Sequence, residues 1–336
     1  MKVVGLDIGG ANLKAATDQG ICCSRPFPLW QRPEMLAEEI RMLLSRLRPS
    51  EILAVTMTGE LADCFATKAD GVRRILESVE AASAGREIRV WTTQGKFVAP
   101  AEARREWSSV AAANWHALAT WLGREQKIQN GLLVDIGSTT TDLIPISNQH
   151  PCTLGLTDVG RLMAGELVYA GVWRTPFCAV LEEVPFRDEK CPLGAELFST
   201  TGDAFLLLGE IAEEPGNCDT ANGKPATIEA AYDRLVRQIC CDRTEVSLAE
   251  ARLIATGVKQ QLKDKIGKSL NRVLSRLSKP CETVVVSGSG EFFARQIVAA
   301  EESLQHVPVV SLAEKLSPEV ATAACGYAVA KLAQNG

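Results

Sequence analysis

One short pattern occurs twice in this sequence, and it restricts the possible folds more than any other feature. Residues 3–14 read as an apolar strand that ends in Asp7, a glycine turn and a second strand. Residues 131–144 repeat this order around Asp135. A single glycine hairpin is common in proteins without any ligand, but a repeat of this kind indicates two similar halves whose hairpins face one cleft.

Both hairpins carry the residues of a phosphate-binding site. Glycine lets backbone amides approach an anion that a Cβ atom would block. A carboxylate at a strand end can hold a hydrated Mg²⁺ ion beside phosphates, so we predict Mg²⁺ as the cofactor and Asp7 and Asp135 as its ligands. A third glycine turn, between a strand at 283–286 and a helix, is another possible anion site or a simple tight turn. The predicted phosphate-binding residues are Gly9, Gly10, Asn12, Lys14, Gly137, Ser138, Thr139, Thr140, Gly288, Ser289 and Gly290.

Composition excludes some classes of partner. The 336 residues favour two domains, and 46% apolar with 23% charged residues is typical of a globular protein. A net charge of -5 with no basic stripe argues against a nucleic-acid partner. No apolar run reaches the length of a membrane span, and Asp7 interrupts the apolar start, so neither a membrane partner nor a signal peptide is expected. The eleven cysteines contain no CxxC pattern, which favours reduced thiols in the cytoplasm. No pattern specifies an oligomeric state.

The order of predicted elements indicates the fold class. Strands are expected at 3–9, 12–17, 21–30, 52–57 and 87–92, with helices at 34–47, 71–82 and 105–124. This order is typical of a ribonuclease-H-like α/β unit. It begins again with strands at 132–135, 140–146 and 150–156, and the chain ends in a small-residue helix at 318–334. We therefore predict two ribonuclease-H-like lobes with a central cleft: 1–130 plus 318–336, and 131–317 with an insertion at about 177–225.

The ordered set of motifs resembles the actin, sugar-kinase and Hsp70 ATPase superfamily. The Asp7 and Asp135 hairpins look like its first and second phosphate motifs. Residues 284–291 resemble its adenosine motif, and residues 318–334 its second connecting helix.

Within this superfamily the chain resembles the hydantoinase A/oxoprolinase-like group. The similarity is strongest to a branch linked to tetrahydromethanopterin-dependent one-carbon metabolism, through residues 57–63, 112–115, 135–142, 169–176 and 199–203. That branch includes a methanofuran-biosynthesis transferase, which joins an (aminomethyl)furanylmethyl diphosphate to the phenol of a γ-glutamyl-tyramine. The resemblance implies loss of diphosphate, a need for Mg²⁺ and no consumption of ATP. It leaves a tyrosine-type phenol open as the acceptor.

Four carboxylates are the catalytic candidates: Asp7, Asp135, Asp142 and Glu60. Ether formation requires a base for the phenol proton, and Asp142, Glu60 and Asp203 could each serve. Strand alternation after the second hairpin puts Asp142 near the site, although it could instead cap a turn.

Three residues are the expected substrate ligands: Asp63, Arg174 and Asp203. Arg174 could bind a substrate carboxylate or the diphosphate, or form an ion pair at the surface or between the lobes.

Two other functions remain open. One is an ATP-dependent small-molecule kinase or amide-activating enzyme of the same fold, and the other is a non-catalytic nucleotide-sensing module. The bulky Phe292 and Phe293 follow the third glycine turn, where a kinase would need space for adenine. This argues for a diphosphate on a smaller apolar group, unless both rings face the core.

Overall fold

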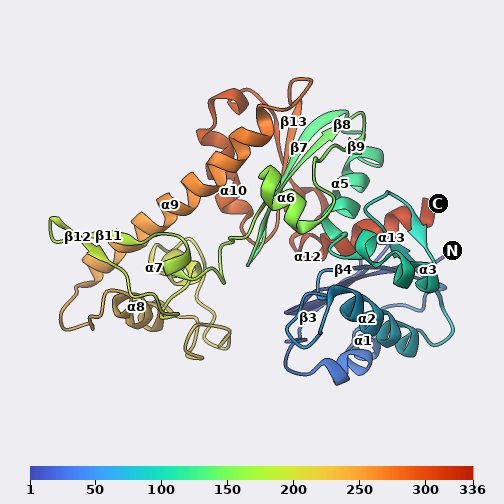
Figure 1. Ribbon diagram of the computed structural model, residues 1–336, viewed down its shortest axis with the longest axis horizontal. Coiled ribbons are helices and arrows are strands. Elements are labelled where there is room, and N and C mark those ends of the chain that lie inside the picture. The colour runs from blue at the N-terminus through green and yellow to red at the C-terminus, as the bar shows by residue number, and fades with distance from the viewer. Residues whose placement is uncertain (336) are drawn as a thin grey trace.

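Two mixed β-sheets form the framework of the protein, whose computed structural model describes residues 1–335 (Figure 1). The strands of the first sheet are β1 (Val3–Ile8), β2 (Asn12–Thr17), β3 (Cys22–Pro26), β4 (Ile52–Met57), β5 (Glu87–Trp91) and β6 (Phe97–Val98). Their order is β3-β2-β1-β4-β5-β6, with β1 antiparallel to β2 and parallel to β4.

The second sheet repeats this plan. Its strands are β7 (Asn130–Ile136), β8 (Thr141–Ser147), β9 (His150–Pro151), β10 (Leu167–Val168), β13 (Thr283–Ser287) and β14 (Val309–Ser311). The order is β10-β8-β7-β13-β14, with β9 beside β8. β7 is antiparallel to β8 and parallel to β13, as β1 is to β2 and β4. The α/β fold with two ribonuclease-H-like units is therefore confirmed.

The outer strand of the second sheet is not where the sequence predicted it. The expected strand at 150–156 is wrong beyond Pro151, and β10 takes the outer position. The cause is the buried carboxylate of Glu166, which accepts hydrogen bonds from the N–H groups of Leu154 (2.7 Å) and Gly155 (3.0 Å). These amides are thereby withdrawn from any strand ladder.

Most predicted helices are present, but two are interrupted. The helices are α1 (Leu36–Leu44), α2 (Lys68–Ala82), α3 (Pro100–Arg105), α4 (Trp107–Val110), α5 (Asn114–Arg124), α6 (Asp158–Ala164), α7 (Thr201–Leu207), α8 (Ile228–Arg237), α9 (Leu248–Leu274), α10 (Glu291–Ala300), α11 (Leu312–Leu316), α12 (Pro318–Thr322) and α13 (Ala324–Asn335), with 3₁₀ turns at Pro33–Met35, Phe177–Ala179 and Glu302–Leu304. The expected helix at 105–124 breaks before α5, where Ala112 has a φ of 48°. The expected helix at 318–334 breaks at Ala323, which has non-helical angles. No helix among residues 1–335 is both long and apolar enough to cross a bilayer.

The helices α5 and α13 lie between the two sheets. One buried cluster contains Val3 and Ile52 of the first sheet, Leu133 and Ile144 of the second, and much of both helices. α13 crosses β1 so closely that a Cβ atom on Gly5 would lie 1.8 Å from the carbonyl oxygen of Gly326. The small residues of the C-terminal helix therefore serve backbone contact. The lobe boundaries at 130 and 318 stay predictions.

A third unit projects from the second sheet and has a core of its own. It contains α7, α8, the hairpin β11 (Glu183–Phe186) and β12 (Glu189–Pro192), and the first half of α9 (Figure 1). Its buried cluster runs from Phe177 to Val258, so the inserted unit continues well past the predicted end at about 225. The reason is that α9 is shared: its first half covers this unit, and its second half covers the second sheet.

Candidate functional site

The two glycine hairpins have the same pattern of backbone hydrogen bonds. The N–H of Gly9 donates to the carbonyl of Asn12 (3.0 Å), and the N–H of Gly137 donates to that of Thr140 (2.8 Å). Each turn is covered by the end of the neighbouring parallel strand. The N–H of Gly59 donates to Ile8 (3.0 Å), and the N–H of Gly290 donates to Ile136 (2.8 Å). The Gly288 turn is thus the counterpart, in the second half, of the Thr58-Gly59 turn in the first.

Strand register places a charged partner opposite each hairpin aspartate. Asp7 is paired with Lys14 across β1 and β2, and Asp135 is paired with Asp142 across β7 and β8. Directly opposed residues share one face of a sheet. On that face, Gly5 contacts α13 and Leu133 belongs to the core shared by both sheets. Because side chains alternate along a strand, both aspartates point from their own sheet toward the layer between the sheets.

The electrostatics show that these groups lie close together. The pKa of Asp135 is raised to about 7, mainly by burial and also by the charges of Asp142 and Asp7, while Lys14 opposes the rise. Burial also raises the pKa of Asp7, again against Lys14. Cys325 of α13, which the sequence analysis missed, is buried beside the same charges, and burial raises its pKa well above the ordinary value. The structure therefore brings together Asp7, Lys14, Asp135 and Asp142 from the two halves.

One oxygen in this group is suited to a cation. Oδ1 of Asp7 is buried and has no hydrogen-bond partner within residues 1–335. A buried carboxylate oxygen normally has a partner, so an unpartnered one beside a second carboxylate fits an ion with oxygen ligands. The described part of the chain has no group of three or more His, Cys, Asp or Glu ligands. Two carboxylates with water and phosphate oxygens are a set that Mg²⁺ accepts.

The third predicted turn lies against Asp135. Gly288 has a φ of +90°, and a Cβ atom there would lie 2.5 Å from Oδ1 of Asp135. The Ser287 side chain also hydrogen-bonds the Asp135 carboxylate, which lowers the pKa of that group. Glycine is therefore required at 288 both by the backbone angle and by the approach of the carboxylate.

The two phenylalanines after this turn do not bear on nucleotide binding. Phe293 is completely buried in the core of the second sheet, and its ring packs edge-to-face against Phe205, 5.1 Å between centroids. Phe292 packs against the same ring at 5.3 Å. Their bulk fills the junction with the inserted unit, so the sequence argument that it excludes adenine does not hold.

Glu60 is a buried carboxyl with an unused oxygen. Its side chain is 1% exposed, and its Oε2 has no hydrogen-bond partner among residues 1–335. Burial raises its pKa to about 7, against the opposing hydrogen bond from the backbone of Ala112. The preceding residue, Gly59, covers the first glycine turn, because a Cβ atom there would lie 3.2 Å from the carbonyl carbon of Gly9. Perturbed buried carboxyls beside a ligand site are candidates for proton transfer.

This pKa gives a prediction for stability against pH. The folded protein holds a proton on Glu60 up to about pH 7, while the unfolded chain releases it near 4.5, so stability falls as pH rises between these values. Glu60→Gln removes this dependence. Wild type should therefore lose stability between pH 4.5 and pH 8, whereas the variant should not lose this contribution. Relative to wild type, the unfolding free energy of the variant should be higher at pH 8 than at pH 4.5 by roughly 3 kcal/mol. Urea unfolding at both pH values measures it. The exposed Glu34→Gln is the control, and an equal difference at both pH values for Glu60→Gln would contradict the assignment.

Asp142 is engaged by an arginine that the sequence analysis missed. Nη1 of Arg161 lies 2.7 Å from Oδ1 of Asp142, and the Arg161 side chain is almost completely buried against the ring of Trp115. The only signal in the sequence is a lone arginine in the apolar stretch that follows Asp158 in α6. The neighbouring Asp158 pairs with Lys68 of α2 (3.3 Å), which links the second half to the first. As part of a buried ion pair, Asp142 is a weaker candidate for the base than Glu60.

The three expected substrate ligands lie in different surroundings. Asp63 is exposed on the segment after β4. Asp203 is buried in the inserted unit, where Oδ1 accepts from Arg234 (2.7 Å) and Oδ2 accepts from the N–H of Thr200 (3.0 Å). Both of its oxygens are thus occupied within the inserted unit, which favours a structural role. Arg174 lies beside the second glycine turn, since its N–H donates to the carbonyl of Ser138 (2.8 Å).

The sequence is similar to proteins of one known family. The hydantoinase/oxoprolinase family profile matches residues 51–335. A (4-{4-[2-(γ-L-glutamylamino)ethyl]phenoxymethyl}furan-2-yl)methanamine synthase from Methanocaldococcus jannaschii is 33% identical, over 99% of this chain and 98% of that protein. A synthase of the same name from Methanococcus vannielii is 31% identical, over 62% of this chain and 92% of that protein.

A solved structure supports the fold. Nucleotide-free acetone carboxylase superposes on 98% of this chain and 70% of its own, with a TM-score of 0.54 and 12% identity. At this identity the likeness concerns the fold alone, which is that of the actin, sugar-kinase and Hsp70 superfamily.

Proposed function

Because this chain belongs to the hydantoinase/oxoprolinase family, we propose that it is a transferase that forms an aryl-alkyl ether. Its donor is an (aminomethyl)furanylmethyl diphosphate, and its acceptor is the phenol of a γ-glutamyl-tyramine or of a tyrosine-type compound. Diphosphate is the leaving group. The reaction belongs to the synthesis of a methanofuran-type cofactor for tetrahydromethanopterin-dependent one-carbon metabolism.

The observation that carries this proposal is similarity over nearly the whole chain to a protein named as the synthase of a phenoxymethyl-furan. Such a product contains an oxygen between a phenyl ring and a furanylmethyl carbon. Making this bond from a phenol requires a leaving group on the furanylmethyl carbon. Two glycine hairpins that converge at four charged groups, Asp7 with Lys14 and Asp135 with Asp142, suit a diphosphate in that position.

The chain has residues for both ends of the reaction. Asp7 and Asp135 would hold Mg²⁺, which when bound neutralises charge on a leaving diphosphate. Backbone N–H groups of the two turns and the Lys14 ammonium bind and orient the phosphate oxygens. The carbon–oxygen bond to diphosphate breaks, the phenol oxygen bonds to the same carbon, and the phenol proton passes to a base. Glu60 is the candidate for that base, because its oxygen has no partner and its pKa is about 7.

The test is release of diphosphate. Given a furanylmethyl diphosphate, a phenolic acceptor and Mg²⁺, the protein should release diphosphate and form the ether without ATP. Mass spectrometry of the product and an assay for diphosphate measure the two outputs. A kinase or amide-activating enzyme of this fold would instead bind ATP more tightly than diphosphate and release ADP with a small acceptor. That result would overturn the proposal.

A further inference from the structure

We propose that the Arg174 guanidinium binds the diphosphate of the donor, and that Asp219 of the inserted unit occupies this guanidinium until the donor arrives. The inference rests on the proposed function, because that function supplies a diphosphate between the two glycine hairpins. It adds the Arg174 side chain to the two turns and Lys14 as ligands of the leaving group. It also assigns Asp219 as an exchange partner, which no pattern in the sequence indicates.

The backbone of Arg174 is fixed on the second hairpin. The N–H groups of Trp173 (3.1 Å) and Arg174 (2.8 Å) both donate to the carbonyl of Ser138. Gly171 lies so close that a Cβ atom there would be 2.4 Å from the carbonyl oxygen of Gly137. The base of the Arg174 side chain therefore stands directly behind the predicted phosphate turn at 137–140.

The head of the side chain reaches the first hairpin. The guanidinium carbon lies 5.6 Å from the centroid of the Trp30 ring, within the range of a cation–π contact. Trp30 follows Leu29, whose N–H donates to the carbonyl of Gly10 (2.9 Å) in the first turn. Arg174 thus extends from one phosphate hairpin to the edge of the other. A diphosphate bound by both turns would lie within the reach of this side chain.

Asp219 holds the guanidinium in the way that a phosphate would. Nη2 of Arg174 donates to Oδ1 (2.9 Å) and Oδ2 (2.8 Å) of Asp219, and Nε donates to Oδ2 (3.2 Å). Arginine forms the same two-pronged contact with carboxylate and phosphate oxygens. The Asp219 side chain is 60% exposed, and exposed ion pairs contribute little to stability. Exchange of this carboxylate for a more highly charged diphosphate is therefore favourable.

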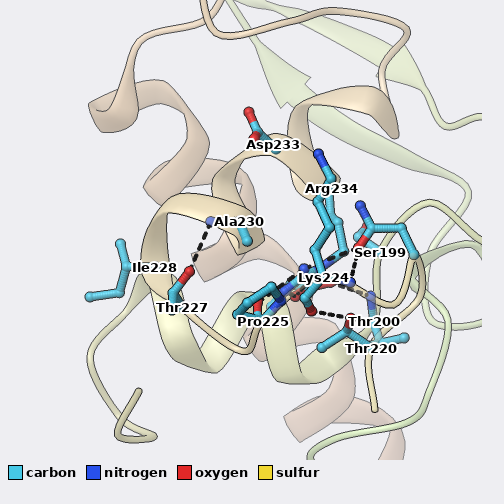
Figure 2. Close-up of polar contacts among 12 residues, drawn as sticks. Ser199, Thr200, Thr220, Lys224, Pro225, Thr227, Ile228, Ala230, Asp233 and Arg234 are labelled. Carbon is cyan, nitrogen blue, oxygen red and sulfur yellow. Dashed lines mark hydrogen bonds and ion pairs between the residues drawn. The ribbon is translucent and has the colours of Figure 1, made fainter. Parts of the chain in front are cut away.

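The loop that carries Asp219 is anchored, so the exchange involves a side chain and not the whole loop. The Nε1–H of Trp173 donates to the carbonyl of Asp219 (3.0 Å). Arg234 anchors the far end of the loop through Asn222 (3.3 Å) and the carbonyl of Pro225 (3.4 Å), and Figure 2 shows this arginine among the loop residues. The buried pair between Arg234 and Asp203 fixes the anchor. Asp203 thereby has a structural role in the anchor of the loop.

The experiment measures binding of inorganic diphosphate with Mg²⁺ by calorimetry. Arg174→Gln should weaken binding by about tenfold or more, since it removes charge-assisted hydrogen bonds. Asp219→Asn should tighten binding by about threefold, because it removes a weak competitor for the same guanidinium. The effects have opposite signs, whereas a purely structural ion pair predicts no effect of either variant on diphosphate affinity. Unchanged affinity in both variants would overturn the proposal.

Two controls separate the alternatives. Arg187→Gln breaks another exposed ion pair of the inserted unit, with Glu250, and should leave diphosphate affinity unchanged. Tyrosine and tyramine differ by one carboxylate, so variants that alter only tyrosine affinity would assign Arg174 to the acceptor and overturn the proposal. Turnover of the furanylmethyl diphosphate by wild-type protein tests the proposed function separately. If wild type turns over this donor but the Arg174 and Asp219 variants bind diphosphate with unchanged affinity, only the role of Arg174 in diphosphate binding is rejected.

Discussion

Replacing either hairpin aspartate with asparagine is expected to lower kcat by roughly 10²–10³-fold or more, the usual cost of losing one preorganised electrostatic contact. Asp7→Asn and Asp135→Asn keep the shape of the side chain but remove the charge that would hold Mg²⁺. Stability should not fall with activity, because burial already disfavours the charge at both positions. Activity with saturating Mg²⁺ and urea unfolding measure the two quantities.

The matched control is Asp188→Asn, the same change at the exposed β11–β12 turn. Asp188 has a φ of 65°, which asparagine also adopts readily, so both activity and stability should remain at the wild-type level. Full activity in both hairpin variants would mean that Asp7 and Asp135 only complete their turns.

The second large effect concerns the crossing of β1 and α13. Gly5→Ala should lower the free energy of unfolding by about 3 kcal/mol or more, the upper range for overpacking a core. The new methyl group would lie 1.8 Å from the carbonyl oxygen of Gly326 and 2.9 Å from the backbone nitrogen of Ala330. Neither atom belongs to a flexible side chain, so β1 or α13 must move as a unit. Because Asp7 follows two residues later, activity should fall as well.

Urea unfolding of Gly5→Ala is compared with Gly267→Ala in the middle of α9. A Cβ atom on Gly267 would have no neighbour within 4 Å, and its backbone is helical. Alanine there should stabilise the protein by about 0.5–1 kcal/mol. A Gly5→Ala protein as stable as wild type would show that β1 and α13 can separate by about 1.2 Å, the difference between 1.8 Å and the 3.0 Å that a Cβ contact requires.

Local chemistry explains why so much of the fold could be predicted. The two strand–Asp–Gly–strand hairpins depend on residues that are neighbours in the chain, and their strands pair as the sequence indicated. Periodicity also located α2 and the strand before the third glycine turn. The repeat of the hairpin, rather than either copy, indicated two similar halves.

The sequence-based predictions were wrong where residues far away in the chain determine the local hydrogen bonds or the extent of a unit. The strand predicted at 150–156 does not form beyond Pro151, because the buried carboxylate of Glu166 accepts hydrogen bonds from the backbone of this segment. The inserted unit is longer than predicted because one continuous helix, α9, covers two cores. No local pattern distinguishes the two halves of such a helix.

By itself, the sequence determined the two glycine hairpins, the carboxylates near the ends of their first strands and the ribonuclease-H-like order of elements, because these follow from contacts between near neighbours. Only the tertiary structure decided which side chains act together. It paired Asp142 with Arg161, enclosed Asp203 with Arg234, left one oxygen of Glu60 unpartnered and set Arg174 between Trp30 and Asp219. The physical reason is that burial and pairing of a charge depend on groups far away in the chain, which only the packing of the sheets, α5, α13 and the inserted unit brings near.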